Sequence, residues 1–253
     1  QDKVLVWYAK HQRDLPWRKT RDPYKILVSE VMLQQTQVDR VVKYYRHFLM
    51  KYPTLIDLAK AEKVELLSMW QGLGYNNRVL RLQQMALEIV KRKKGFPQKY
   101  EELLELPGIG PYTARAVLAF AFNQEVPVVD TNIRRVLIVE LGIDEKIEVK
   151  ELEEVALRCV PMGRSCEWHN ALMDYGALVA TAHVTGVESL SKQGVFEGST
   201  RQVRSSIVKY LLEKKKATLK ELREKFMHEE FDAIVAKMMK EGLVKENEGM
   251  LML

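Results

Sequence analysis

Apolar residues recur at helical spacing along most of the first part of the chain. In one such stretch, Val38, Val41, Tyr45 and Leu49 would lie on one face of a helix, and Pro or Gly residues separate neighbouring stretches. The pattern predicts that residues 1–185 form one domain that is almost entirely helical.

The pattern changes after this domain. Residues 186–198 (GVESLSKQGVFEG) have no sustained helical period and are predicted to be a linker. Residues 199–253 predict three short helices, the second opened by a capping box from Thr218 to Glu221 and the third ended by Gly242. Two short apolar strands around a Glu-Asn-Glu-Gly turn would follow. This order is typical of a winged helix-turn-helix domain, and an untyped helical cap is the alternative.

Composition adds a functional hint to this mostly helical prediction. The 253 residues are 47% hydrophobic and 29% charged, with no apolar run long enough to cross a membrane, as expected of a globular, non-membrane protein. The N-terminal segment lacks the features of a signal peptide, so we expect a cytoplasmic or nucleoid-associated protein. A net charge of +6 favours a polyanionic partner. The two cysteines, Cys159 and Cys166, have no CxxC spacing and are predicted to be free buried thiols.

The string LPGIGPYTARAV, residues 106–117, predicts a tight turn between two helices. Gly108 and Gly110 permit backbone angles that other residues resist, so the turn amides and a helix N-terminus can point at one phosphate. Such a turn would bind the DNA backbone without reading bases. An ordinary glycine-containing turn is the alternative. The predicted backbone-binding hairpin consists of Leu106, Gly108, Ile109, Gly110 and Thr113.

Two carboxylates suggest the chemistry. Glu30 has apolar neighbours on both sides in KILVSEVMLQQTQV, so burial would raise its pKa and suit it to act as a general acid. Asp130 in PVVDTNIRRVL precedes a helix and, taken alone, is typical of an N-cap. For Glu30 the alternative is a structural role, in which its side chain hydrogen-bonds a neighbouring helix; the sequence is equally compatible with this. Together, a protonated Glu30 and an ionised Asp130 match the requirements for cleaving an N-glycosidic bond, in analogy to glycoside hydrolysis.

Six strings, LPWR, RDPY, SEVMLQQTQV, WQGLGYNNR, LPGIGPYTA and VDTNIRRVL, resemble in their order and intervals those of the A/G-mismatch adenine DNA glycosylases (the MutY family). The likeness covers roughly residues 4–182. It implies an all-α, two-lobed helix-hairpin-helix fold with DNA across the cleft and the target nucleotide flipped out. Glu30 would then protonate adenine at N7 and later activate water, while Asp130 stabilises or transiently bonds the sugar.

The resemblance also implies roles for other residues. Asn132 and Tyr112 would border the sugar, and Tyr112 stands where bifunctional relatives carry a lysine nucleophile, so we expect base removal without strand cleavage. The adenine pocket and the duplex wedge would be formed by Trp17, Arg18, Leu33 and Asp174, and by Gln35 and Tyr75, respectively. For the apolar and aromatic members of this set, plain core packing is the alternative.

The chain departs from the family in two places. The family's [4Fe–4S] ligands would fall at Ala180, Val187, Leu190 and Phe196, so no cluster is expected. Binding of a monovalent cation at the hairpin is compatible with the sequence. Residues 199–253, with 12 basic and 9 acidic side chains, replace the usual β-rich recognition domain. They could grip flanking duplex or dock a protein. Asn76 and Thr131 also differ from the usual residues.

Two rival functions remain at this stage. A thymine or uracil glycosylase acting on G·T or G·U mismatches would share the hairpin, Tyr112 and Asp130, but a pyrimidine has no N7 for Glu30 to protonate. A non-catalytic DNA-binding regulator would be expected to lack one carboxylate. The expected partner is double-stranded DNA with a mismatched or damaged base, bound by a monomer.

Overall fold

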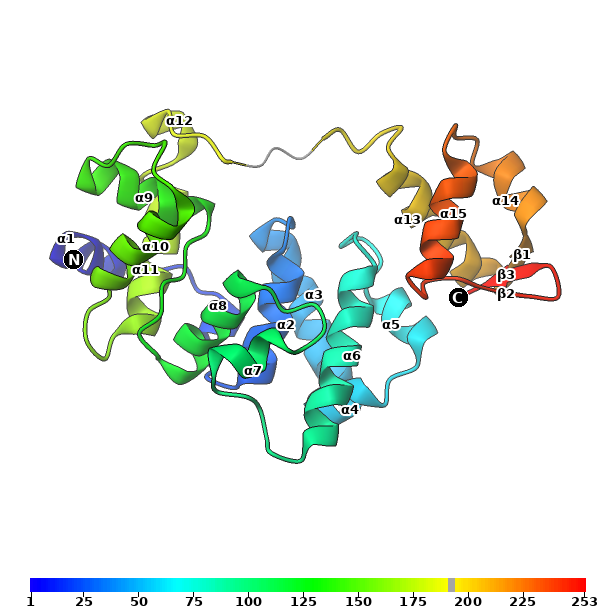
Figure 1. Cartoon of the computed structure of the whole chain (residues 1–253), viewed down its shortest axis with the longest axis horizontal. Helices are drawn as coiled ribbons and strands as arrows, with labels where there is room; N and C mark the ends of the chain where they lie inside the picture. The colour runs from blue at the N-terminus through cyan, green and yellow to red at the C-terminus, as the bar shows by residue number, and fades with distance from the viewer. Residues whose placement is uncertain (191–193) are drawn as a thin grey trace. The chain divides into compact units, whose positions relative to one another are not determined.

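The computed structural model describes residues 1–190 and 194–253 and is mostly helical (Figure 1). The chain packs into two compact units, each assembled from two separate stretches of sequence. The first unit comprises Gln1–Glu30 with Lys94–Lys192, and the second comprises Val31–Lys93 with Gln193–Leu253. Of the predicted linker, residues 191–193 lie outside the described residues.

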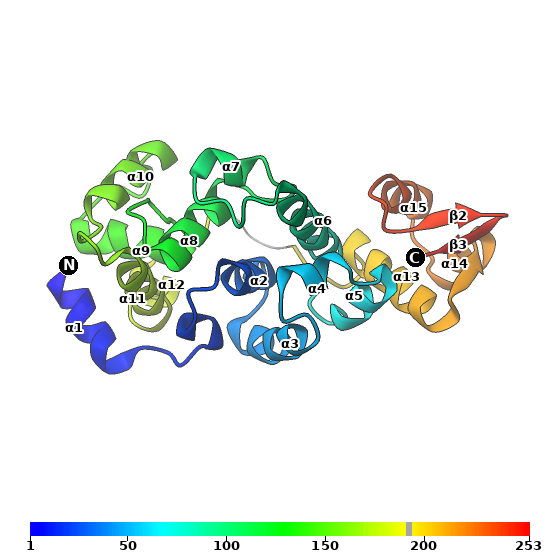
Figure 2. The same ribbon diagram turned by 90° about the horizontal axis from the view of Figure 1, so that it is seen from below.

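The regular elements in the described part of the first unit are all helices. Its elements are α1 (Asp2–His11), a 3-10 helix η1 (Pro16–Lys19), most of α2 (Pro23–Leu33), α7 (Tyr100–Leu104), α8 (Pro111–Phe122), α9 (Thr131–Leu141), α10 (Val149–Arg158), α11 (Ser165–Leu178) and α12 (Ala182–Thr185). One core joins α1 to α9, α10 and α11 through buried side chains such as Leu5, Val136, Leu152 and Trp168. This packing fixes α9 and α11 side by side, which positions the site described below (Figure 2).

The second unit begins with four helices. They are α3 (Val38–Lys51), α4 (Leu55–Ala59), α5 (Lys63–Met69) and α6 (Asn77–Arg92). Thr54 and Asp57 form a reciprocal capping box at the start of α4, and α4 packs along α6. Phe48 and Trp70 meet edge to face in the core.

The C-terminal part of the second unit is a small helical bundle with a three-stranded sheet. Its elements are α13 (Thr200–Lys214), β1 (Lys216–Thr218), α14 (Leu219–Lys225), α15 (Phe231–Lys240), β2 (Lys245–Asn247) and β3 (Met250–Met252). The strands are antiparallel in the order β1-β3-β2, with Ala217 opposite Leu251 and Glu246 opposite the same residue.

The sequence predicted the three helices and the strand β3 of this region correctly, but β2 is exposed and polar and includes Glu246 and Asn247 of the predicted turn, where an apolar strand before the turn was expected. The hydroxyl of Thr218 caps α14 by accepting from the amide of Glu221 at 3.1 Å, and Gly242 follows α15 with a left-handed φ of 69°. Strand β1 was not predicted, because a three-residue segment between two helices has no period to detect. No helix in the described part of the chain has the length and apolarity that crossing a bilayer requires.

Candidate active site

The glycine-containing turn lies where the sequence placed it, between α7 and α8. Gly108 has a φ of 83°, which favours glycine, and Gly110 precedes Pro111 at the first turn of α8. Leu106 and Ile109 are buried, and the amide of Ile109 bonds the carbonyl of Leu106 at 3.2 Å. The two apolar side chains therefore anchor the turn in the core and leave the backbone of the glycines accessible to a ligand. Thr113 is also buried.

The α8 helix carries Tyr112 to Glu30. Glu30 lies on α2 with only 7% of its surface exposed, and the phenol of Tyr112 donates a hydrogen bond to its carboxylate. Burial, followed by the charge of nearby Asp130, raises the pKa of Glu30 to about 7, whereas the Tyr112 hydrogen bond acts in the opposite direction. Burial and the Glu30 charge raise the pKa of Tyr112 well above its usual range, so Tyr112 remains the donor. Glu30 can therefore hold a proton near neutrality.

Asp130 is the N-cap of α9. Its carboxylate accepts from the amide of Ile133 at 2.7 Å and from Nδ2 of Asn132 at 3.1 Å. Burial raises the pKa of Asp130, while these hydrogen bonds and the charge of Arg135 oppose that rise. Asp130 is only half-buried, so part of the residue stays accessible to a substrate. The cap and the candidate catalytic group are thus the same carboxylate, and the two readings of Asp130 do not exclude each other.

Arg135 supports the Asp130 end of α9 and was not predicted from the sequence. Its guanidinium donates to Oδ1 of Asn132 at 3.3 Å and to the carbonyls of Gly176, Ala180 and Val187 at 3.1–3.4 Å. Most of these partners come from α11 and the segment after it, which are distant in sequence, so the local sequence around Arg135 does not predict them. A buried arginine within the apolar helix NIRRVLIV is the signal that could have found it.

The predicted base-pocket residues Arg18 and Asp174 form a buried ion pair. Both carboxylate oxygens of Asp174 accept from Arg18, at 2.5 and 2.6 Å, and Arg13 adds its amide at 2.9 Å and its Nε at 2.6 Å. Burial works against ionisation, but the hydrogen bonds from Arg18 and Arg13 outweigh it and hold the pKa of Asp174 below its usual range. Trp17 is buried in η1 beside Arg18 in sequence. Asp174 therefore fixes the position of Arg18.

The remaining predicted residues, Leu33, Gln35 and Tyr75, belong to the second unit. Leu33 is half-buried at the end of α2, while Gln35 and Tyr75 are exposed with left-handed φ values of 55° and 49°. Residues other than glycine rarely adopt a left-handed backbone conformation, so the surrounding structure must hold Gln35 and Tyr75 in it.

Arg78 provides many of the hydrogen bonds that fix the backbone next to Gln35 and Tyr75. One end of its guanidinium, Nη1, donates to the carbonyls of Val31, Met32 and Gln34 at 2.7–3.0 Å. The other end, Nη2, donates to the carbonyls of Leu73 and Gly74 at 2.9 and 3.0 Å. Burial lowers the pKa of Arg78 to about 10. Arg78 therefore ties the segment before Gln35 to the 72–76 loop, a role that the string WQGLGYNNR did not reveal.

The residues at the four positions where the family ligates a cluster do not fit such a group, in line with the expectation from the sequence. Ala180 and Val187 are buried apolar residues whose carbonyls bond Arg135, and Leu190 and Phe196 offer no metal-binding atoms. Cys166 is buried, Cys159 is half-buried, and both thiols are free. Among the described residues, no group of His, Cys, Asp and Glu side chains could hold a metal ion.

Comparison with known proteins identifies the family. A family model described as the HhH-GPD superfamily of base excision DNA repair proteins matches residues 28–162, just over half of the chain. The chain belongs to this superfamily, and its fold is that of the helix-hairpin-helix glycosylases.

Relatives named adenine DNA glycosylase are similar over about 70% of the chain. The protein of Rattus norvegicus is 41% identical over 192 residues, covering 70% of this chain and 37% of the relative. That of Mycolicibacterium smegmatis is 42% identical over 183 residues, covering 71% and 62%. The chain spans 33–37% of the length of the plant and mammalian relatives it matches.

Solved structures agree on the fold. A thermostable thymine-DNA glycosylase is 33% identical with a TM-score of 0.66, over 71% of this chain and 85% of that one. A non-covalent endonuclease III–DNA complex, 24% identical with a TM-score of 0.63 over 72% and 84%, is alike in fold alone.

Proposed function

We propose that this protein is an adenine DNA glycosylase that hydrolyses the N-glycosidic bond of a flipped adenine mispaired with guanine or 8-oxoguanine. The observation that carries the proposal is the pairing of Glu30, whose pKa of about 7 lets it hold a proton, with Asp130, held by two hydrogen-bond donors at a helix N-terminus. Relatives with the corresponding name are 36–42% identical to this chain.

The proposed reaction follows from the two environments. Glu30 gives its proton to N7 of adenine, so the base leaves as a neutral molecule while the C1′–N9 bond breaks. Asp130 stabilises the positive charge that develops on the sugar, helped by Asn132. The ionised Glu30 then takes a proton from water, which adds its oxygen to C1′. Tyr112 keeps its proton and holds the Glu30 carboxyl, and because it is not an amine, it forms no Schiff base.

A second candidate substrate is thymine or uracil mispaired with guanine. It is favoured by the likeness to the thymine-DNA glycosylase structure. The adenine proposal is preferred because a pyrimidine offers no N7 to a buried, protonated Glu30.

We further propose a winged helix for the C-terminal elements, consistent with their order α13-β1-α14-α15-β2-β3 and antiparallel sheet. Its net charge of +3 over residues 199–253 favours contacts to DNA phosphates beside the lesion. The division into a glycosylase domain (1–185), a linker (186–198) and this domain (199–253) is part of the same proposal.

A cleavage panel tests the proposed activity. Duplexes carrying A·8-oxoG, A·G, A·C, T·G and U·G are incubated with excess enzyme, and alkali then reveals abasic sites. We expect strand breaks only after alkali, and only in duplexes with adenine as the target. Breaks at T·G or U·G alone would favour the pyrimidine alternative.

Substitution of Asp130 tests the mechanism within the same panel. We expect Asp130→Asn to slow single-turnover excision by a factor on the order of 100 or more while duplex binding survives, because the amide cannot stabilise a developing cation. Asp144→Asn is the matched control, since Asp144 is an exposed carboxylate of the same unit that accepts a local amide. A near-normal rate for Asp130→Asn would leave Asp130 as a cap only.

A further inference from the structure

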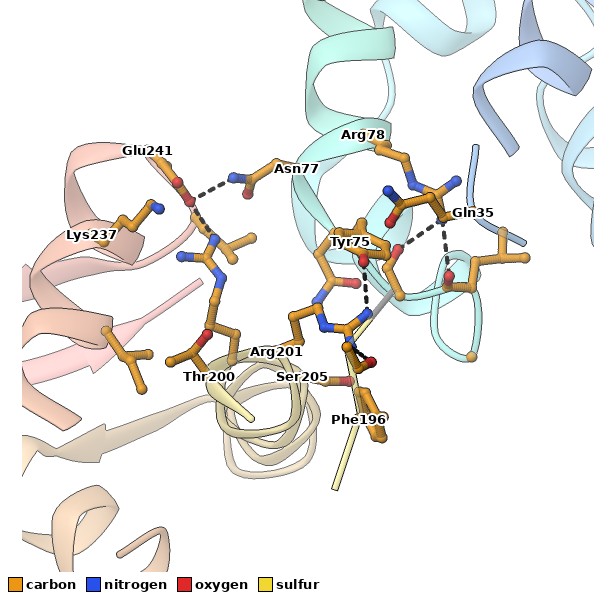
Figure 3. Close-up of a pocket in the computed structure, with 18 of the residues that line it drawn as sticks. Gln35, Tyr75, Asn77, Arg78, Phe196, Thr200, Arg201, Ser205, Lys237 and Glu241 are labelled. Carbon is orange, nitrogen blue, oxygen red and sulfur yellow. Dashed lines mark hydrogen bonds and ion pairs between the residues drawn. The ribbon is translucent and has the colours of Figure 1, made fainter. Parts of the chain in front are cut away.

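A groove of about 1000 Å³ opens within the second unit, between the 72–76 loop and the C-terminal helices α13 and α15 (Figure 3). Gln35 and Tyr75, the two exposed residues with left-handed backbone, both line it. The groove is therefore shared by the proposed duplex wedge and by the segment that replaces the family's usual recognition domain. We name it the wedge groove.

The wedge groove is strongly basic. Its two acidic residues are Glu230 and Glu241, and Glu241 is already paired with Arg204. Its basic residues are Arg40, Arg78, Arg81, Arg201, Arg204 and Lys237. Such an excess of positive charge beside exposed aromatic rings is typical of sites that bind a nucleic-acid strand, because the charges track the phosphates and the rings stack on bases.

Arg201 connects the C-terminal segment to Tyr75. Its Nη1 donates to the Tyr75 hydroxyl at 2.7 Å, and its Nη2 donates to the carbonyl of Gly194 at 2.6 Å. The guanidinium carbon lies 5.7 Å from the centre of the Tyr75 ring and 6.0 Å from that of Phe196, and Arg78 lies 5.6 Å from the same Tyr75 ring. Tyr75 is thus held by Arg78 from the first turn of α6 and by Arg201 from α13.

Other contacts fix α13 and α15 against the same loop. Glu241 at the end of α15 accepts from Nδ2 of Asn77 at 2.5 Å and pairs with Arg204 of α13. Lys63 of α5 donates to the carbonyl of Gly242 at 2.6 Å. Because these bonds join the C-terminal elements to the start of α5 and the start of α6, Arg201 is placed beside Tyr75 by the fold and is not carried by a free tether.

Gln35, which lines the wedge groove, is close in sequence to Glu30, the proposed general acid. Gln35 follows Glu30 by five residues, so the two Cα atoms cannot be more than about 18 Å apart. A duplex whose flipped adenine reaches Glu30 would bring its other strand within range of side chains at this distance.

We propose that the wedge groove receives the DNA strand opposite the excised base, with its unpaired nucleotide beside Tyr75 and Phe196, and that Arg201 positions Tyr75 for it. The inference rests on the proposed glycosylase function. In this arrangement the C-terminal segment takes part in discrimination among opposite bases, because the orientation of the ring that contacts the opposite nucleotide depends on Arg201.

Three variants test the positioning role. Arg201→Ala removes the bonds that Arg201 makes to Tyr75 and Gly194. Arg201→Lys keeps the charge but loses the planar fork that bonds the hydroxyl and the carbonyl together. Arg223→Ala is the matched control, since Arg223 is a basic residue of α14 that pairs with Asp232 and does not line the wedge groove. Thermal unfolding monitored by circular dichroism confirms that each variant is folded.

The first readout is discrimination. Single-turnover excision is measured with A·8-oxoG, A·G and A·C duplexes, and the ratio between the best and worst opposite base is compared. We expect both Arg201 variants to lower this ratio about tenfold, and Arg223→Ala to leave it unchanged. A uniform loss over all duplexes, with a salt slope reduced by about 0.9, would instead identify Arg201 as a plain phosphate contact and overturn the proposal.

The second readout does not depend on excision. A duplex with 2-aminopurine opposite a non-cleavable abasic analogue reports stacking on an aromatic ring through its fluorescence. Wild-type protein should quench it, Arg201→Ala and Arg201→Lys should quench it less, and Arg223→Ala should match the wild type. Equal quenching by all four proteins would contradict the inference. If wild-type protein excises no adenine yet these binding differences persist, the proposed function fails and the wedge groove assignment stands.

Discussion

Glu30 and Asp130 show how different surroundings can suit two carboxylates to the different roles proposed for them. Glu30 is buried and lies near the charge of Asp130, so its pKa rises to about 7 even though Tyr112 donates a hydrogen bond to it. Burial raises the pKa of Asp130 as well, but this rise is opposed by hydrogen bonds from Ile133 and Asn132 and by the charge of Arg135, and the N-terminus of α9 also favours the ionised form. The two carboxylates are thus suited to the acid and the charge-stabilising parts of one reaction.

The sequence could predict these two carboxylates but not the arginines that organise the site. Apolar residues on both sides of Glu30 predict its burial, and the helix after Asp130 predicts the cap. Arg78 and Arg135 bond mainly backbone carbonyls, and Arg13 bonds a carboxylate far away in sequence. A carbonyl has no sequence signature, so these contacts follow only from the tertiary structure.

Replacement of Glu30 should stabilise the protein while abolishing excision. The pKa of Glu30 in the folded state is about 7, above its ordinary value of 4.5, so the folded protein binds this proton more tightly than the unfolded chain. Stability should therefore fall as pH rises from about 4.5 to 7. Glu30→Gln removes this cost, and its amide oxygen can still accept from Tyr112. We expect Glu30→Gln to exceed wild type in unfolding free energy by up to about 3 kcal/mol at pH 8, and by much less at pH 5.

Urea unfolding at pH 5 and pH 8 measures this difference. Glu88→Gln, which replaces a partly exposed glutamate on α6 that pairs with Lys91, is the control and should track the wild type at both pH values. A Glu30→Gln variant less stable than wild type at pH 8 would mean that Glu30 is ionised and paired in the folded protein.

At the scale of elements, the site depends on how closely two helices approach. α9 carries Asp130 and Asn132 at its N-terminus, and α11 passes beside it with Gly176 at the crossing. A Cβ atom added at Gly176 would lie 2.7 Å from the carbonyl oxygen and 2.8 Å from the Cβ of Asn132. Gly176 is therefore required for close packing rather than for a turn, which the string MDYGAL alone does not reveal.

Gly176→Ala should consequently impair catalysis more than stability. The added methyl pushes the start of α9 away, and a displacement approaching 1 Å at a reacting group can cost a factor of about 100 in rate. We expect single-turnover excision to fall by a factor of 10 to 100, with the affinity for duplex retained. Leu178→Ala, which removes an exposed side chain two residues later on α11, should leave the rate unchanged. Equal rates for Gly176→Ala and wild type would show that α11 can shift without disturbing Asn132.

The segment after α11 leads to a prediction about iron. Its residues Ala180 and Val187 are packed inside the first unit, and Arg135 bonds their carbonyls. Because apolar side chains and an arginine provide no thiolate, we expect the purified protein to contain no iron and to lack the visible absorbance of an iron–sulfur cluster. Elemental analysis of protein purified anaerobically measures this. Stoichiometric iron would show that the alignment of Ala180 with a family ligand is wrong.

At the scale of the whole molecule, packing groups segments that are distant in sequence. The spacing of apolar residues shows where a helical pattern ends, and in this sequence it ends at residues 186–198. It does not show which segments bury one another, because that depends on shape and on long-range polar contacts. The structure joins Gln193–Leu253 to Val31–Lys93 in one unit, through α13 against α5 and through bonds such as Asn77 to Glu241.

This organisation predicts that the C-terminal elements remain bound after the chain is cut. With a protease site inserted at residues 191–193, cleavage should leave the fragment that carries α13–β3 associated with the rest, because the packing of α13 on α5 and the Lys63 and Glu241 bonds do not depend on chain continuity. Size-exclusion chromatography of the cut protein should give one peak that contains both pieces. Lys63→Ala combined with Asn77→Ala should weaken retention, whereas Lys209→Ala, at an exposed position of α13, should not. Separate elution of the two wild-type pieces would show that the C-terminal elements are held mainly by the chain, and Arg201 would then lack the fixed position beside Tyr75 that its proposed role requires.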